Sequence, residues 1–285
     1  MPLRQPQVPR HDAGTEAAVN GGRSVVPVER VAETGSTNAD LLEAARRAPA
    51  DLPFAARALV ATRQTAGRGR QGRRWQATPG ASLAFSLAWP LPKMDLSGLS
   101  LAVGVALAEA LDPRPAEPLR IGLKWPNDLW LVGTDERGRK LGGVLIETVP
   151  HGDGRVAVIG VGLNLREQVV EGAASGVAWL GEIDPGTQPE PLLDRLLVAL
   201  AEGLDGFERD GFAAFADRYA ARDLLRGRAV VAQASDGDRR GTAAGIAESG
   251  ELLLRSADGS LHRVGSGEVS IRFATPEARP AAAPC

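Results

Sequence analysis

Cysteine and histidine are scarce in this chain of 285 residues. The one cysteine is the last residue, Cys285, and the three histidines are His11, His151 and His262. A single thiol forms neither an intramolecular disulfide nor a cysteine metal cluster, and it fits a reducing cytoplasm. The histidines stand in unrelated parts of the sequence, so neither a zinc site nor a triad built on histidine is predicted.

Long apolar runs and a strong net charge are absent too. The longest apolar run, Leu99–Leu111, is too short to span a bilayer and contains Glu109. Residues 1–23 lack the apolar core segment that a secretory signal needs. The formal net charge is −2, so the chain as a whole does not attract nucleic acid or membranes. We therefore expect a cytoplasmic protein with no membrane or nucleic-acid partner.

Lysine is the third scarce residue. Thirty of the 33 lysines and arginines are arginines, and the lysines are Lys93, Lys124 and Lys140. An ammonium is a compact point charge that reaches a single oxygen, whereas a guanidinium is a planar fork. Either the three lysines persist by chance, or Lys124 and Lys140 mark places where a fork does not serve. For Lys93, in a proline-bounded loop, chance is the favoured interpretation.

What the chain does contain is a cationic, glycine-rich segment, residues 63–75, which we name the arginine loop. It holds five arginines and three glycines and ends at Trp75. Glycines let the backbone turn sharply and lie close to a ligand, and guanidinium forks match carboxylate and phosphate oxygens. The segment therefore predicts an anion-binding loop.

Two other interpretations of the arginine loop need weighing. Gly67, Gly69 and Gly72 satisfy the G-x-G-x-x-G pattern of dinucleotide-binding folds, which requires a helix directly after the glycines and an acidic residue about twenty positions later. Residues 73–80 contain proline and glycine and lead into a predicted strand, and the first acid near position 92 is Asp95, beyond Pro90 and Pro92. A nucleic-acid-binding arm is the second alternative, although one such loop without other basic surface gives it little support.

Predicted strands and helices divide the chain into four parts. Residues 1–24 are predicted to be disordered and residues 276–285 to be a tail. Between them we predict a larger domain over residues 25–222 and a small β domain over residues 223–275, where short strands follow at close spacing. Consecutive strands joined by short turns favour an antiparallel or mixed sheet in the larger domain. Strands are expected there at 25–31, 58–62, 82–89, 121–125, 129–132, 140–147 and 155–165, and helices at 39–48, 97–111, 191–207 and 211–221.

Two local patterns place small polar side chains near this sheet. Residues 82–89 alternate large apolar residues with serine and alanine, a period of two that is typical of a strand. The small face either lines a cavity or packs under a helix. Ser36, Thr37 and Asn38 precede the helix expected at 39–48; they either only cap it or also bind a ligand at its N-terminus.

Five motifs, in their order along the chain, resemble the motif set of the biotin–protein ligases. They are Ser36–Asn38, Gln64 with Gly67–Trp75, Lys124–Asp128, Lys140–Glu147 and Gly160–Leu165. Each is weak alone, but the ordered set covers most of residues 25–270 and is specific. The resemblance implies an α+β fold, with a mixed sheet and flanking helices like those of class II aminoacyl-tRNA synthetases. A small SH3-like β-barrel follows at the C-terminus, and residues 265–270 are similar to its closing segment.

The resemblance also implies a reaction with ATP and biotin as substrates and Mg²⁺ as the accompanying ion. Biotin would attack the α-phosphate of ATP to give biotinyl-5′-AMP and pyrophosphate. A lysine of a biotin carboxyl carrier domain would then take the acyl group and release AMP. Both substrates of the first step are anions, so an arginine loop with a nearby lysine supplies positioning and charge without a protein nucleophile.

The matching motif positions imply a role for each candidate site residue. The biotin-contacting set is Ser36, Thr37, Asn38, Gln64, Arg68, Gly69, Arg70 and Lys140. The nucleotide-contacting set is Arg70, Arg73, Trp75, Asn127, Lys140 and Asn164, with Trp75 stacking near the adenine. Arg70 and Lys140 are the candidate catalytic residues. Asp128 is a candidate for the metal or for orienting the acceptor amine, and Lys124 would support the loop.

Three further expectations follow from the resemblance. Many bacterial members begin with a winged helix-turn-helix, whereas about 24 unpatterned residues precede the fold here, so we expect no operator binding. The lipoate–protein ligases are the alternative within the superfamily, but the motifs at 67–70 and 124–128 favour biotin. The arginine loop is expected to be poorly ordered when empty and to close over the adenylate, shielding it from water.

Overall fold

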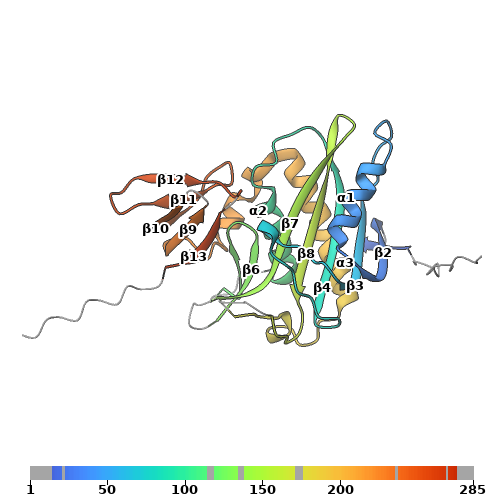
Figure 1. The fold of residues 1–285 in the computed structure, drawn as a ribbon, viewed down its shortest axis with the longest axis horizontal. Helices are drawn as coiled ribbons and strands as arrows, with labels where there is room; N and C mark the ends of the chain where they lie inside the picture. Colours follow the sequence, from blue (N-terminus) through green and yellow to red (C-terminus); the bar gives the residue numbers. More distant parts are fainter. Residues whose placement is uncertain are drawn as a thin grey trace, which may run out of the picture.

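Two β-sheets form the framework of the chain (Figure 1). The computed structural model describes residues 15–20, 23–113, 119–133, 138–170, 176–234, 237–267 and 269–274. The larger sheet contains β1 (Thr15–Asn20), β2 (Arg23–Thr34), β3 (Arg57–Gln64), β4 (Ser82–Leu91), β5 (Ile121–Lys124), β6 (Asp128–Val132), β7 (Gly138–His151) and β8 (Gly154–Asn164). They lie in the order β1-β2-β3-β4-β8-β7-β6-β5, antiparallel except for the parallel pair β2 and β3. The predicted mixed sheet is confirmed.

Helices flank the larger sheet on both faces, as Figure 1 shows for α1 and α3. α1 (Thr37–Arg47) packs with Leu41 against Val158 of β8. The next residue of β8, Ile159, faces the opposite side and joins the core formed with α2 (Leu99–Leu111) and α3 (Pro189–Asp210). The short helices η1 (Arg70–Gly72), η2 (Leu180–Glu182), η3 (Gly211–Phe215) and α4 (Ala216–Ala220) are the remaining described ones. None of the described helices is long and apolar enough to cross a membrane.

Strand β1 corrects part of the prediction for the N-terminal segment. Thr15–Asn20 pairs antiparallel with β2, and β2 itself begins at Arg23, so disorder throughout residues 1–24 is wrong for these residues. Pairing at a sheet edge satisfies backbone groups whatever the side chains, which is why composition did not predict it. Residues 1–14 and the predicted tail at 276–285 lie outside the described residues.

The two faces of β4 meet different surroundings. Its large residues Leu83 and Leu87 are buried in the core under α2 and α3. On the small face, Ala88 packs under α1, whereas Ser86 lines a pocket beside the N-terminus of that helix. Both predicted uses of the small face therefore occur, at different positions along one strand.

The second sheet lies beside the first (Figure 1) and is antiparallel throughout. It contains β9 (Ala229–Ala234), β10 (Gly237–Ile246), β11 (Leu252–Arg255), β12 (Leu261–Val264) and β13 (Ser270–Phe273), in the order β12-β11-β10-β9-β13. Trp125, which is buried, donates its indole N–H to the carbonyl oxygen of Gly250 at 3.0 Å and so joins the two sheets. The domain boundary at residues 222–223 stays a prediction; residues 222–224 exchange backbone hydrogen bonds with β5.

Candidate active site

A pocket of about 190 Å³ opens between the N-terminus of α1, the arginine loop, the sheet and the C-terminal strand β13. The structure brings most predicted site residues to this pocket. Its lining includes Ser36, Thr37, Asn38, Gln64, Arg68, Gly69, Arg70, Arg73, Trp75, Asn127, Asp128 and Lys140. It also includes residues that the sequence did not single out, among them Ser86 and Ser270. The roles assigned to these residues stay predictions, but their gathering at one place is a feature of the fold.

The N-terminus of α1 forms one wall of the pocket. Ser36 is the N-cap, and its side chain accepts a hydrogen bond from the backbone N–H of Ala39 at 3.5 Å. The backbone N–H of Thr37 donates to Gln64 Oε1 at 2.9 Å, which ties the helix start to the end of β3. Ser36 therefore caps the helix, as predicted, while its neighbours face the pocket.

Two glycines of β8 form the floor of the pocket. A Cβ atom on Gly160 would lie 2.3 Å from Asn38 Oδ1, and one on Gly162 would lie 2.3 Å from the Trp75 indole. Asn38 and Trp75 therefore rest directly on the strand, over glycines two positions apart. The missing side chains are what let a residue of α1 and a residue of the arginine loop approach the same strand.

The arginine loop folds as a small hairpin. Trp75 N–H donates to the Gly67 carbonyl at 2.9 Å, and Gly69 N–H donates to the Arg73 carbonyl at 2.7 Å. A Cβ on Gly67 would lie 2.6 Å from the Trp75 carbonyl oxygen, so this position needs glycine for close approach. The glycines lead through η1 into β4 and not into an α-helix, which rules out the dinucleotide-binding alternative. Ordering of the loop by ligand stays a prediction.

The arginines of the loop reach across to the C-terminal sheet. Arg70 donates to Asn127 Oδ1 at 3.3 Å, to the Gly267 carbonyl at 3.0 Å and to the Ser266 carbonyl. Arg73 donates to Ser270 Oγ at 3.3 Å. Burial lowers the pKa of the Arg70 guanidinium, and the Asp128 carboxylate opposes that shift. Both forks are thus held by neutral oxygens, which an anionic ligand would outcompete because charge-assisted hydrogen bonds are stronger.

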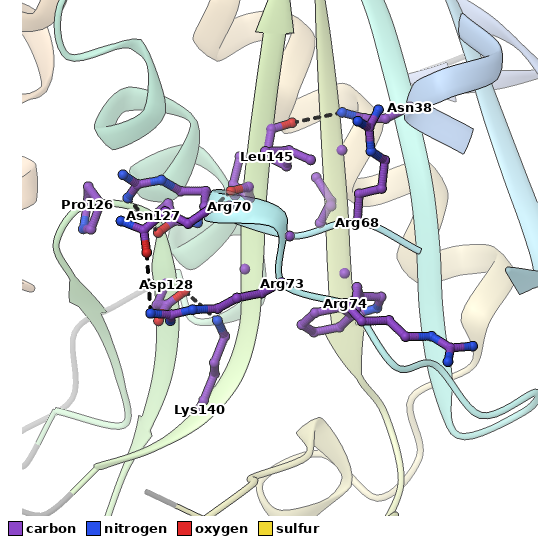
Figure 2. A pocket seen from close by; sticks show the side chains of 18 of the residues that line it. Asn38, Arg68, Arg70, Arg73, Arg74, Pro126, Asn127, Asp128, Lys140 and Leu145 are labelled. Carbon is purple, nitrogen blue, oxygen red and sulfur yellow. Dashed lines mark hydrogen bonds and ion pairs between the residues drawn. The ribbon is translucent and has the colours of Figure 1, made fainter. Parts of the chain in front are cut away.

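Lys140 and Asp128 form an ion pair on the same side of the pocket as Asn127 and Arg70 (Figure 2). Lys140 Nζ lies 2.6 Å from Asp128 Oδ1. A Cβ on Gly143 would lie 3.3 Å from each of these two atoms, so this glycine leaves room for the pair. The neighbouring amide of Asn127 donates to the Val144 carbonyl at 2.7 Å. Asp128 is the one carboxylate among the described residues that line the pocket.

Lys124 lines the pocket where the two sheets meet. Its ammonium donates to the Ile271 carbonyl of β13 at 2.7 Å and stands 5.0 Å from the Trp130 ring centroid. Burial lowers the pKa of Lys124 from 10.5 to about 8; nearby cations add to the shift, and the Asp128 carboxylate opposes it. Support of the arginine loop by Lys124 stays a prediction; the hydrogen bond that the structure shows is with the C-terminal sheet.

The low pKa of Lys124 predicts a pH dependence of stability. Since the folded pKa lies below the unfolded one, the folded state binds fewer protons between pH 8 and 10.5, and stability rises with pH in that window. The unfolding free energy of the wild type, minus that of Lys124→Met, should rise by about 2 kcal/mol from pH 7.5 to pH 10. Urea denaturation at both pH values measures it. The exposed Lys93→Met is the control, and a pH-independent difference for Lys124→Met would contradict the shift.

Asn164 is the predicted site residue that the structure does not bring to the pocket. It is buried at 3% exposure, and its amide nitrogen donates to the Ala178 carbonyl at 3.0 Å and the Lys140 carbonyl at 3.4 Å. Its Oδ1 accepts from Gln168 at 2.7 Å. Asn164 therefore holds the backbone behind Lys140, and a direct contact with nucleotide stays a prediction.

Comparison with known proteins identifies the family. The model of the Biotin/lipoate A/B protein ligase family matches residues 48–164, and that of the Biotin protein ligase C terminal domain matches residues 226–272. The chain is 36% identical to the Bifunctional ligase/repressor BirA of Escherichia coli over 76% of this chain and 67% of that protein. It is 35% identical to the Biotin--[acetyl-CoA-carboxylase] ligase of Paracoccus denitrificans over 80% of this chain and 94% of that protein.

The structural comparison agrees with the sequence matches. The fold resembles the Aquifex aeolicus biotin protein ligase solved in complex with biotin and ATP, with a TM-score of 0.70 and 28% identity over 87% of this chain and 99% of that one. The expected mixed sheet with flanking helices and a separate C-terminal β-sheet is thereby confirmed. Both family matches lie in the expected order along the sequence. The chain belongs to the biotin–protein ligase family.

Proposed function

We propose that this chain is a biotin–[acetyl-CoA-carboxylase] ligase, which activates biotin with ATP and transfers it to a lysine of a carrier protein. The observation that carries the proposal is the convergence of Arg70, Lys140 and the polar wall at Thr37, Asn38 and Gln64 in one pocket. The cations suit a carboxylate and a phosphate, and the polar wall suits the uncharged head of biotin, which has two N–H donors and a carbonyl. The family membership supports the same activity.

In the proposed first step, the biotin carboxylate displaces pyrophosphate from the α-phosphate of ATP. The forks of Arg70 and Arg73 offset the repulsion between the two anions, and Lys140, paired with Asp128, adds a single compact donor. The chain contributes positioning and charge, and the attacking oxygen belongs to biotin itself. Trp75, on the β8 floor, is proposed to stack against adenine.

Mg²⁺ is proposed to accompany ATP. Magnesium is usually held by one or two carboxylates together with substrate phosphates, and Asp128 supplies one carboxylate to the described lining. The described residues contain no cluster of three histidine, cysteine or acidic side chains that would hold a metal alone. The donor set thus fits an ion brought in with the nucleotide, whose charge would neutralise the leaving pyrophosphate.

In the proposed second step, the carrier lysine attacks the acyl carbon of biotinyl-5′-AMP and AMP leaves. Orienting that amine is the alternative role proposed for Asp128, whose carboxylate is an acceptor beside Lys140. The carrier is proposed to be the biotin carboxyl carrier domain of a biotin-dependent carboxylase, and the location to be the cytoplasm. The scarcity of cysteine and the names of the curated relatives support this part of the proposal.

Exchange of labelled pyrophosphate into ATP tests the function. We expect exchange with biotin and none with lipoate or octanoate. Exchange that required lipoate or octanoate would replace the proposal by the lipoate–protein ligase alternative. Absence of exchange, together with salt-sensitive retention on RNA or DNA at physiological salt, would favour the nucleic-acid-binding alternative.

A further inference from the structure

The side chain of Asn38 is enclosed by three adjacent strands. It lies over Gly160 of β8, which pairs with Ser86 of β4 on one side and with Leu145 of β7 on the other. Ser86 donates to Asn38 Oδ1 at 2.6 Å. The Asn38 amide nitrogen donates to the Leu145 carbonyl at 3.3 Å (Figure 2) and to Glu147 Oε2 at 3.1 Å. The exposed fractions of Asn38 and Ser86 are 3% and 0%.

These contacts fix which way the Asn38 amide points. Its nitrogen faces the Glu147 carboxylate and a carbonyl, both of which are acceptors, so the opposite orientation would set oxygen against oxygen. The amide oxygen must then face Ser86, whose hydroxyl donates its one hydrogen to that oxygen. A flipped Asn38 would leave buried groups unpaired, and an unpaired buried polar group destabilises the fold because its lost hydration is not replaced.

The same logic extends to Thr37 and Gln64. Thr37 Oγ1 lies 2.7 Å from Ser86 Oγ and 3.2 Å from Gln64 Oε1, and its hydroxyl has one hydrogen to donate. Since the Ser86 hydrogen is donated to Asn38 and Gln64 Oε1 already accepts from the Thr37 N–H, we assign the Thr37 hydrogen to Ser86, the nearer oxygen. The Thr37 oxygen is left as an acceptor. Gln64 Oε1 is held by the Thr37 N–H at 2.9 Å, which leaves the Gln64 amide nitrogen as the group that it offers. The wall of the pocket therefore presents an acceptor and a donor at defined places.

We propose that Ser86 and Glu147 are positioning residues that fix the hydrogen-bond polarity of the biotin site by holding Asn38. The chain of donors runs Thr37 to Ser86 to Asn38 to Glu147. This arrangement leaves the Thr37 oxygen as an acceptor and the Gln64 amide nitrogen as a donor. These groups match the N–H and C=O of a ureido ring, and the dithiolane of lipoate cannot use them. The inference rests on the proposed function and adds the residues that give the site its selectivity for the head of biotin.

Paired variants of Glu147 test the hydrogen bond to Asn38. Glu147→Ala removes the acceptor and should weaken biotin binding on the order of tenfold. Glu147→Gln keeps an acceptor oxygen and should bind biotin within about threefold of wild type, since the ion pair of Glu147 among the described residues is with the half-exposed Arg68 at 3.8 Å. Equal weakening by the two variants would overturn the proposal, because the charge and not the acceptor would then matter.

Ser86→Ala tests the other side of Asn38. We expect biotin affinity to fall on the order of tenfold while the KM for ATP stays within about twofold of wild type. Titration calorimetry with biotin alone separates affinity from the fraction of folded protein, which appears as the stoichiometry. A merely structural serine would lower the stoichiometry and leave the dissociation constant unchanged, and that result would overturn the proposal. The exposed Glu43→Gln of α1 is the control for both series.

The same titrations separate this proposal from the proposed function. Failure of the wild type to bind biotin would refute the function itself. Biotin binding by the wild type, with unchanged affinity in Ser86→Ala and Glu147→Ala, would refute only the positioning roles. Lipoate titrated in parallel is expected to bind neither the wild type nor the variants, and tight binding of lipoate to the wild type would contradict the proposed selectivity.

Discussion

Lys140→Arg is expected to lower the rate of pyrophosphate exchange about a hundredfold or more, although it keeps the positive charge. The Lys140 ammonium lies 2.6 Å from Asp128 Oδ1 in a space that exists because residue 143 is glycine. A planar guanidinium is wider than an ammonium and would have to displace Asp128 or Gly143. The donor would then miss the place where the carboxylate of biotin and the α-phosphate of ATP are proposed to meet.

Exchange kinetics with saturating biotin and ATP measure the effect of Lys140→Arg. Lys93→Arg is the matched control, since it makes the same change at an exposed lysine outside the pocket. We expect thermal unfolding of the two variants to be similar, because Lys140 is a partly exposed side chain. Near-normal exchange in Lys140→Arg would contradict the view that this position needs a compact charge.

The parts of the site that the sequence predicted have local signals. Ser36 precedes an amphipathic stretch, and its cap and the start of α1 at Thr37 follow from the preference of serine for the first position before a helix. The composition of the arginine loop predicts an anion-binding segment. Its glycines permit a close backbone approach at Gly67 and a turn at Gly72, where φ is 70°. The strand pattern at residues 82–89 also follows from neighbouring residues alone.

The parts that the sequence did not predict depend on contacts between distant segments. Ser86 meets Asn38 across 48 positions, and Lys124 meets Ile271 across 147 positions. No local propensity encodes such a pairing, since it depends on how strands neighbour one another in the sheet. The family resemblance named Asn38 but not Ser86, because motifs record contiguous residues and not the partners that hold them.

The contacts between the arginine loop and the C-terminal domain were also not predicted from the sequence. Arg70 and Arg73 were predicted as ligand contacts, and the structure adds that both reach residues between Ser266 and Ser270. A guanidinium carries five donors, so one arginine can hold a ligand and a neighbouring domain. The loop thus bridges the two sheets, in addition to its proposed role as an anion site.

Arg70→Gly is expected to release biotinyl-5′-AMP about a hundredfold faster than wild type, if two charge-assisted hydrogen bonds of about 1.5 kcal/mol each are lost. The variant also removes the bonds to Asn127 and to the Gly267 carbonyl, which hold the arginine loop beside the C-terminal sheet. Adenylate that leaves the pocket is a reactive mixed anhydride. It should label lysines of any protein nearby.

Labelling of a bystander protein measures this escape. Serum albumin is incubated with biotin, ATP and the Arg70→Gly variant, and the biotin attached to it is quantified. Arg63→Gly is the matched control, because it removes an exposed guanidinium that pairs with Glu33 at the start of the same loop. Arg70→Gly should label the bystander strongly while Arg63→Gly and wild type do not. Bystander labelling at the wild-type level, from an Arg70→Gly variant that still makes adenylate, would mean that the fork of Arg70 does not retain the intermediate, and that its contacts with the C-terminal sheet are its main role.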